Sequence, residues 1–270
     1  MDMTDLEARG LVLLGCGKMG SALLEGWLKQ GMKPASVWVL EPAPSDWLRA
    51  QGVHLNAALP TGPAIVLIAV KPQMMDAALP QLTAMGQGAT LFLSIAAGTT
   101  IAHYERVFGA ATPIIRAMPN TPAAIGRGIS AITGNAHATA AHMALAEALL
   151  SAVGQVVRLA GEHQIDAVTA VSGSGPAYVF HLIETLAAAG VAEGLPAAMA
   201  MQLAKATVAG AGALAEAAGD DPTQLRLNVT SPGGTTAAAL AVLMDADRGF
   251  PALLRAAVHA AAERGRELGR

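Results

Sequence analysis

The sequence predicts an α/β domain with a doubly wound, mostly parallel sheet over residues 1–160, followed by an all-α domain over residues 161–270. Short apolar runs alternate with helix-like segments up to about residue 160, as in a parallel sheet that is covered by helices. Beyond that point the runs stop, and glycine and proline divide the chain into helices. Hydrophobic residues make up 53% of the chain but aromatic residues only 3%, so alanine-rich helices are expected to pack closely.

Seven apolar runs in the first domain have the length of strands. Several are apolar throughout instead of alternating, which predicts strands that are buried on both faces. In chain order the runs are LVLLG (11–15), SVWVL (36–40), AIVLIAV (64–70), ATLFLSI (89–95), TPIIRAM (112–118), GISAIT (128–133) and QVVRL (155–159).

The segments between these runs predict helices that return the chain from one parallel strand to the next. In the first domain the predicted helices cover residues 18–30, 44–51, 73–84, 99–107 and 137–152. In the second domain they cover residues 163–171, 175–190, 196–218, 222–228, 235–246 and 250–267. The segment AEGLP (192–196) joins two of them, since glycine often ends a helix and proline often stands near the next start.

Charge and cysteine content exclude several classes of protein. The net charge is −3 and the basic residues are scattered, which argues against a nucleic-acid or anionic-membrane partner. The single cysteine, Cys16, cannot form an intrachain disulfide, and no metal site is expected. No apolar run approaches the roughly 18–20 residues of a membrane helix. The first ten residues carry acids where a secretory signal needs cations, so a cytoplasmic protein is expected.

A glycine-rich loop follows the first predicted strand in the pattern Gly15-x-Gly17-x-x-Gly20. In a dinucleotide-binding loop the first glycine permits a tight turn, the second lets the backbone approach a pyrophosphate, and the third lets the helix pack on the strand. The helix that opens at Lys18 and Met19 then presents its N–H groups to the anion. A generic glycine turn is the alternative, but this context predicts a Rossmann-like domain that binds NAD(H) or NADP(H).

The second predicted strand is followed by Glu41, about 20 residues beyond Gly20. An acidic residue at this point binds the adenosine ribose in dinucleotide-binding domains and repels a 2′-phosphate. This position favours NADH. The alternative is that Glu41 simply begins the next segment beside Pro42.

Four further stretches carry a family resemblance: AVKPQ (69–73), RAMPNTPA (116–123), SGSGPAY (172–178) and TSPGGTT (230–236). With the glycine-rich loop, and in this order over nearly the whole chain, they resemble pyrroline-5-carboxylate reductase. The resemblance implies reduction of a cyclic imine, 1-pyrroline-5-carboxylate, to proline with NAD(P)H. It also implies homodimers or larger rings of dimers built through the second domain, with active sites that draw residues from both chains. Many such enzymes prefer NADPH and carry polar or basic residues after the second strand, from which Glu41 departs.

The resemblance also implies which residues bind the cofactor. Ala69, Lys71 and Pro72 would border the ribose and phosphates, although an exposed lysine at a strand end is the simpler interpretation of Lys71. Asn120 would lie on the nicotinamide side, and an ordinary turn asparagine is its alternative. Asn228 is assigned to the cofactor as well.

The substrate side falls in the second domain. SPGGTT before an alanine-rich stretch predicts a helix N-terminus with unpaired N–H groups, for which a carboxylate is a natural partner. A simple Ser/Thr-capped helix is the alternative. The resemblance assigns Thr236 to the ring nitrogen as the catalytic residue. Substrate binding is assigned to Ser231, Gly233, Gly234, Thr235, Ser174 and Gly175.

Two other functions remain open from the sequence. A hydroxyacid or phosphogluconate type of dehydrogenase also combines two such domains, and its catalytic lysine would be Lys205. A nucleotide-binding regulator without catalysis is the other, although the intact motif at 230–236 argues against it. Oxidation of NAD(P)H by pyrroline-5-carboxylate distinguishes the reductase from both.

Overall fold

The computed structural model describes residues 3–269, which belong to two compact units. The first unit contains the chain up to Gly173 and again from Ala261 onwards, and the second contains Ser174–Ala260. Residues 161–173, which the sequence assigns to the second domain, therefore pack with the first unit. The last turns of the final helix, from Ala261 onwards, also pack with the first unit.

The first unit is built on an eight-stranded sheet in the order β3-β2-β1-β4-β5-β6-β7-β8. All neighbouring strands are parallel except β6 and β7, so the predicted mostly parallel sheet is confirmed. The strand order reverses between β1 and β4, and ligands of such sheets bind outside the carboxyl ends of the strands at this point. The strands are β1 (Leu11–Leu14), β2 (Val37–Leu40), β3 (His54–Leu55), β4 (Ile65–Ile68), β5 (Leu91–Ser94), β6 (Ile114–Met118), β7 (Gly128–Gly134) and β8 (Gly154–Arg158).

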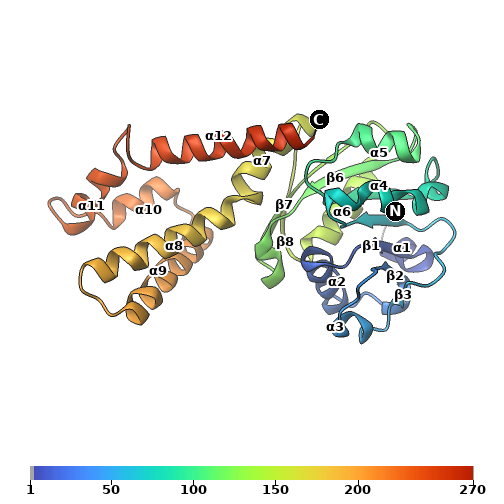
Figure 1. Ribbon diagram of the computed structural model, residues 1–270, viewed down its shortest axis with the longest axis horizontal. Coiled ribbons are helices and arrows are strands. Elements are labelled where there is room, and N and C mark those ends of the chain that lie inside the picture. The colour runs from blue at the N-terminus through green and yellow to red at the C-terminus, as the bar shows by residue number, and fades with distance from the viewer. Residues whose placement is uncertain (1–2, 270) are drawn as a thin grey trace. The chain divides into compact units, whose positions relative to one another are not determined.

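Helices flank this sheet, as Figure 1 shows in blue to green. Alternate residues of one strand enter two separate apolar clusters: Leu11 and Leu13 belong to one, and Val12 and Leu14 to the other. A strand that feeds both clusters is buried on both faces, which explains why the run is apolar throughout. The α-helices are α1 (Met3–Arg9), α2 (Lys18–Lys29), α3 (Asp46–Arg49), α4 (Met75–Ala78), α5 (Ile101–Phe108), α6 (Ala140–Ser151) and α7 (Ile165–Val168).

Shorter 3₁₀ turns stand between several of these elements. They are η1 (Pro34–Ser36), η2 (Pro72–Met74), η3 (Leu79–Met85), η4 (Thr121–Ile125) and η5 (Glu162–Gln164). The single helix predicted over 73–84 is wrong: α4 is one turn long and lies between η2 and η3. Pro80, within this segment, lacks the N–H that a continuous helix would need.

The second unit consists of helices only, so the predicted all-α domain is confirmed. They are α8 (Gly175–Ala192), α9 (Ala197–Ala217), α10 (Pro222–Asn228), α11 (Thr235–Leu243) and α12 (Phe250–Leu268), the last of which ends in the first unit. Helices α8 and α9 pack side by side (Figure 1). A Cβ added to Gly190 would lie 3.3 Å from the Cβ of Ala200, so small residues allow the close approach.

The second unit buries little of its own apolar surface. Its buried hydrophobic residues, among those that the structure describes, are Ala187, Ala200 and Ala204. Helices with large exposed apolar side chains on this scale need a partner to cover them. These exposed side chains include Val179, Phe180, Leu182, Leu186, Val191, Leu195, Met199, Leu203, Leu214, Leu227, Val229, Val242, Leu243, Met244, Phe250, Leu253 and Leu254.

Within residues 3–269, none of the helices combines the length and the hydropathy that crossing a bilayer requires.

Candidate functional site

Two glycines of the glycine-rich loop are required by the packing of the protein itself. Gly15 has a φ of +89°, and a Cβ there would lie 3.0 Å from the backbone of Ala69 and Val70. A Cβ on Gly20 would lie 2.5 Å from the carbonyl oxygen of Gly15, so glycine lets α2 approach the loop closely. The loop thus has the close-packed geometry that the dinucleotide pattern predicts.

Gly17 differs from both, because the space around it is open. It is the N-cap of α2 with a φ of −71°, and a Cβ there would meet no heavy atom within 4 Å. The first turn of α2, which includes Lys18 and Met19, contains no acidic residue, and Gly17 has no side chain to cap it. An open helix N-terminus of this kind fits the pyrophosphate of NAD(P)H.

Glu41 lies at the carboxyl end of β2 and is tied to the glycine-rich loop. Its Oε2 accepts a hydrogen bond of 2.8 Å from the Cys16 N–H, and its Oε1 accepts one of 3.0 Å from Ala43. The side chain of Asn56 bonds both the N–H and the carbonyl of Glu41. Burial and the charge of Glu41 raise the pKa of the Cys16 thiol from 9.0 to about 11, so the thiol stays protonated at neutral pH.

The other residues predicted to bind the cofactor lie at the same edge of the sheet. Ala69 follows β4 and donates its N–H to Leu14 at 2.8 Å, while Lys71 is exposed and precedes Pro72 at the start of η2. Asn120 follows β6, and its Oδ1 accepts a 2.9 Å hydrogen bond from Ile129 at the start of β7. The first unit therefore brings these residues to the edge that carries the glycine-rich loop.

The TSPGGTT stretch forms a turn that leads into α11. The Gly234 N–H donates to the Ser231 carbonyl at 3.0 Å, and Gly234 is the N-cap of a helix that begins at Thr235. The residue with a positive φ is Gly233, at +68°, whereas Gly234 has an ordinary φ of −79°. The first turn of α11 holds no acidic residue and Thr236 is half-buried. The predicted helix N-terminus with N–H groups uncovered by a side-chain cap is present.

The SGSGPAY stretch lies where the chain passes from α7 into α8. The chain continues from α7 through a π-helical turn, η6 (Thr169–Gly173), and the N-cap residue Ser174 into α8. Pro176 has no N–H to donate to the carbonyl of Ser172, so the regular α-helical pattern is interrupted here. A Cβ on Gly175 would meet no heavy atom within 4 Å, and Ser174 makes no side-chain cap bond.

The predicted site residues therefore fall into two groups. Those assigned to the dinucleotide lie in the first unit, except for Asn228, which ends α10 in the second and accepts a 2.7 Å hydrogen bond from Gln224. Those assigned to the substrate, from Ser174 to Thr236, all lie in the second unit.

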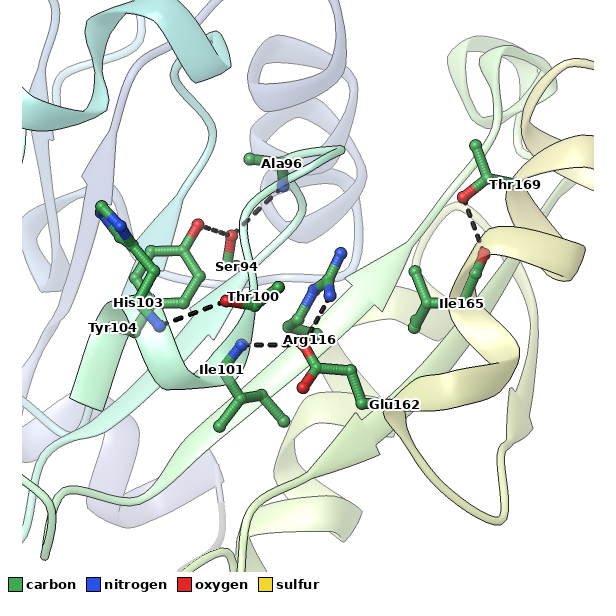
Figure 2. A network of polar contacts seen from close by, with 10 residues as sticks. All are labelled: Ser94, Ala96, Thr100, Ile101, His103, Tyr104, Arg116, Glu162, Ile165 and Thr169. Atoms are coloured by element: carbon green, nitrogen blue, oxygen red, sulfur yellow. Dashed lines mark hydrogen bonds and ion pairs between the residues drawn. The ribbon is translucent and has the colours of Figure 1, made fainter. Parts of the chain in front are cut away.

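A buried polar network in the first unit was missed from the sequence. It consists of the hydrogen bond between Ser94 and Tyr104 and the ion pair between Arg116 and Glu162, around the loop that follows β5 (Figure 2). An arginine inside the apolar run TPIIRAM was the available signal, because a charge on a buried strand requires a partner. Among residues 3–269 there is no cluster of three His, Cys, Asp or Glu side chains that could hold a metal ion.

Comparison with known proteins finds matches over nearly the whole chain. Residues 162–268 match the family model described as pyrroline-5-carboxylate reductase dimerisation. Residues 11–98 match the model described as NADP oxidoreductase, coenzyme F420-dependent. The pyrroline-5-carboxylate reductase of Pseudomonas aeruginosa is 39% identical over 264 residues, which is 96% of each chain. This chain belongs to the pyrroline-5-carboxylate reductase family.

Solved structures of pyrroline-5-carboxylate reductases share the fold of this family member. The enzyme from Coxiella burnetii is 32% identical with a TM-score of 0.91, and the match covers 97% of this chain and 99% of that one. The enzyme from Plasmodium falciparum, solved with NADP bound, is 28% identical with a TM-score of 0.84 over 98% and 99% of the two chains. The resemblance and the fold class predicted from the sequence are confirmed, and the dehydrogenase with Lys205 as its catalytic residue is set aside.

Proposed function

We propose that this chain reduces 1-pyrroline-5-carboxylate to L-proline by hydride transfer from NAD(P)H. The observation that carries the proposal is similarity to pyrroline-5-carboxylate reductases over nearly the whole chain. The open N-terminus of α2 can bind the pyrophosphate of the cofactor, which supports the use of NAD(P)H. The open N-terminus of α11 can bind a carboxylate, which supports a substrate that carries one.

The residues of this chain bind and orient, since NAD(P)H supplies the hydride when it is bound. We assign the pyrophosphate to the N–H groups at the start of α2 and the substrate carboxylate to those around Gly233, Gly234 and Thr235. The Thr236 hydroxyl is assigned to the imine nitrogen, which it orients by a hydrogen bond. A protonated imine is already a strong electrophile, so alignment of the reactants can supply up to roughly 7–11 kcal/mol of the barrier reduction.

The exposed helices of the second unit form the contact between two copies. The family model that covers residues 162–268 is the dimerisation model, and the second unit leaves its large apolar side chains uncovered. We propose a homodimer, or a larger ring of dimers, that acts in the cytoplasm, where amino-acid biosynthesis draws on reduced nicotinamide cofactors.

A single assay tests the reaction. The purified chain is mixed with NADH or NADPH and 1-pyrroline-5-carboxylate, and the loss of reduced cofactor and the formation of proline are followed. The six-membered cyclic imine acid is assayed beside it as a specificity control. Equal amounts of proline formed and cofactor oxidised are expected, and a folded protein that oxidises neither cofactor would refute the reaction.

Replacing Thr236 tests the substrate side. Thr236→Ala should lower kcat/KM by roughly 5–150-fold, because one oriented hydrogen bond is worth about 1–3 kcal/mol. The affinity for NAD(P)H should stay unchanged, since the residues assigned to the dinucleotide lie almost entirely in the other unit. Thr235→Ala is the matched control, because it keeps the backbone N–H and removes only an exposed hydroxyl. Full efficiency in folded Thr236→Ala would mean that its hydroxyl has no role.

Replacing Glu41 tests the choice between the two cofactors. Glu41→Ser should shift the ratio of kcat/KM values towards NADPH by roughly fivefold, since removing a like charge near an exposed phosphate is worth about 1 kcal/mol. Glu41→Gln separates the charge from the geometry, because its amide oxygen can still accept from the Cys16 N–H. Both variants should shift the ratio if the charge selects the cofactor, and an unchanged ratio in both would show that it does not.

A further inference from the structure

The carboxylate of Glu162 joins two parts of the first unit that are distant in sequence. Its Oε1 accepts a hydrogen bond of 2.5 Å from Nη1 of Arg116 on β6 and one of 2.8 Å from the N–H of Ile101, the first residue of α5. Figure 2 shows the carboxylate between these two donors. The Arg116 side chain is only 6% exposed, and that of Glu162 is 32% exposed.

Both donors need this carboxylate for physical reasons. Arg116 lies within β6, a strand buried over its whole length, where an unpaired guanidinium would be costly. Ile101 is in the first turn of α5, where N–H groups lack partners within the helix and the helix dipole favours a negative charge. One carboxylate oxygen therefore stabilises the end of a loop and a buried charge together.

The loop that Glu162 reaches, Ala96–Thr100, is also held at its other end. The Ala96 N–H donates to the Ser94 Oγ at 3.2 Å, and the Ser94 Oγ and the Tyr104 hydroxyl share a hydrogen bond of 2.6 Å. Ser94 and Tyr104 are buried, and burial raises the pKa of the Tyr104 phenol, so it stays protonated. Between the two ends, Gly98 has a φ of +73°.

The Ala96–Thr100 loop lies at the edge of the sheet where the residues assigned to the cofactor are found, so its position can affect the reaction. β5 lies between β4 and β6, and the residues that follow those strands include Lys71 and Asn120, which are assigned to the cofactor. Parallel neighbours end at the same edge, so the Ala96–Thr100 loop lies there too. Because Ala96, Ala97 and Gly98 have almost no side chain, the position of their backbone determines the surface they offer.

We propose that Glu162, by bonding Arg116 and Ile101, positions the Ala96–Thr100 loop for hydride transfer. Glu162 is a positioning residue, because the contacts that it makes are to protein groups. It is also the first residue of the segment that matches the dimerisation model, so the same carboxylate ties that segment to the loop. This inference rests on the proposed function, in that the loop is taken to face the nicotinamide side of NAD(P)H.

The test is a comparison of Glu162→Gln and Glu162→Asp with the wild-type dimer. Glutamine keeps an oxygen for the Ile101 N–H but removes the charge opposite Arg116, whereas aspartate keeps the charge. Glu162→Gln should lower kcat by about 10-fold to 100-fold, with KM and the Kd for NADPH within about twofold of wild type. The primary deuterium isotope effect on kcat should rise, because a misplaced loop slows the hydride step itself. The kcat and the isotope effect of Glu162→Asp should lie between those of Glu162→Gln and those of the wild type.

Glu147→Gln is the matched control. Glu147 pairs with Arg158 in an ion pair of the same unit that is more exposed, with Arg158 50% exposed. Loss of this ion pair in Glu147→Gln should change neither kcat nor the isotope effect.

Hydrogen exchange of the amides from Ala96 to Tyr104 gives a readout that does not depend on turnover. Glu162→Gln should speed exchange there, and Glu147→Gln should not. Unchanged exchange in Glu162→Gln overturns the proposal, as does a lower kcat that only reflects a smaller folded fraction with the isotope effect unchanged. If the wild-type protein does not turn over pyrroline-5-carboxylate, the proposed function fails, and the role of Glu162 in hydride transfer fails with it. If the wild-type is active and Glu162→Gln matches it, only the role of Glu162 fails.

Discussion

Gly17→Val is expected to raise the Kd for NAD(P)H by about 100-fold or more while the first unit stays folded. The structure explains why the unit should stay folded and why cofactor binding should weaken. The φ of −71° at Gly17 is allowed for valine, and a Cβ there meets no protein atom within 4 Å. The same empty space lies in front of the first turn of α2, where the pyrophosphate is expected to approach. A 100-fold loss corresponds to about 2.8 kcal/mol of binding free energy.

Gly20→Val is the matched comparison, because it should fail for a different reason. Its Cβ would lie 2.5 Å from the carbonyl oxygen of Gly15, so it should destabilise the unit even without cofactor. Fluorescence titration with NADPH and thermal unfolding of the apoprotein separate the two effects. If Gly17→Val binds NADPH as tightly as the wild type, the pyrophosphate does not approach α2 in this way.

Replacing exposed apolar residues of the second unit should abolish the dimer and, with it, most of the activity. Phe180 on α8 is 59% exposed and Leu203 on α9 is 51% exposed. The double variant Phe180→Asp/Leu203→Asp places two charges on a surface that a second copy must cover, and each uncompensated buried charge costs several kcal/mol. A monomer with kcat/KM reduced more than about 100-fold is expected, because the resemblance implies that each active site draws residues from both chains, and a 100-fold loss corresponds to about 2.8 kcal/mol of transition-state stabilisation.

Light scattering and the reductase assay on the same samples measure both parts of this result. Ile125→Asp is the control for oligomeric state: Ile125 is 78% exposed but lies outside residues 162–268, so this variant should remain a dimer. An active monomer of the double variant would contradict the proposal that dimerisation supports catalysis.

Local patterns were sufficient for most of the first unit. The run at 11–15 is apolar at every position up to Leu14 because β1 contributes to both apolar clusters, and that property is visible in the sequence. The two-residue strand β3, His54–Leu55, was missed because it is too short to leave a pattern. The segment 73–84 was expected to be one helix because most of its residues favour helix, whereas Pro80 within it cannot donate the backbone hydrogen bond that a continuous helix needs.

Local patterns were less informative about individual functional groups. The sequence identified TSPGGTT as a helix start, but backbone geometry alone shows that Gly233, and not Gly234, has the positive φ. Likewise, Glu41 was recognised by its place after β2, but its hydrogen bond to the Cys16 N–H is visible only in the folded protein.

The sequence by itself thus determined the class of fold, the dinucleotide loop and the family, because each depends on short-range periodicity or on ordered motifs. Tertiary structure decided which distant groups meet. Arg116 and Glu162 are separated by 46 positions, and no pattern in either neighbourhood indicates that they pair. Their contact depends on the order of the strands and on where the chain returns after β8, which places the carboxylate beside a guanidinium on β6 and the first N–H of α5. A buried charge takes the partner that the packed elements bring to it, and that partner is a property of the fold as a whole.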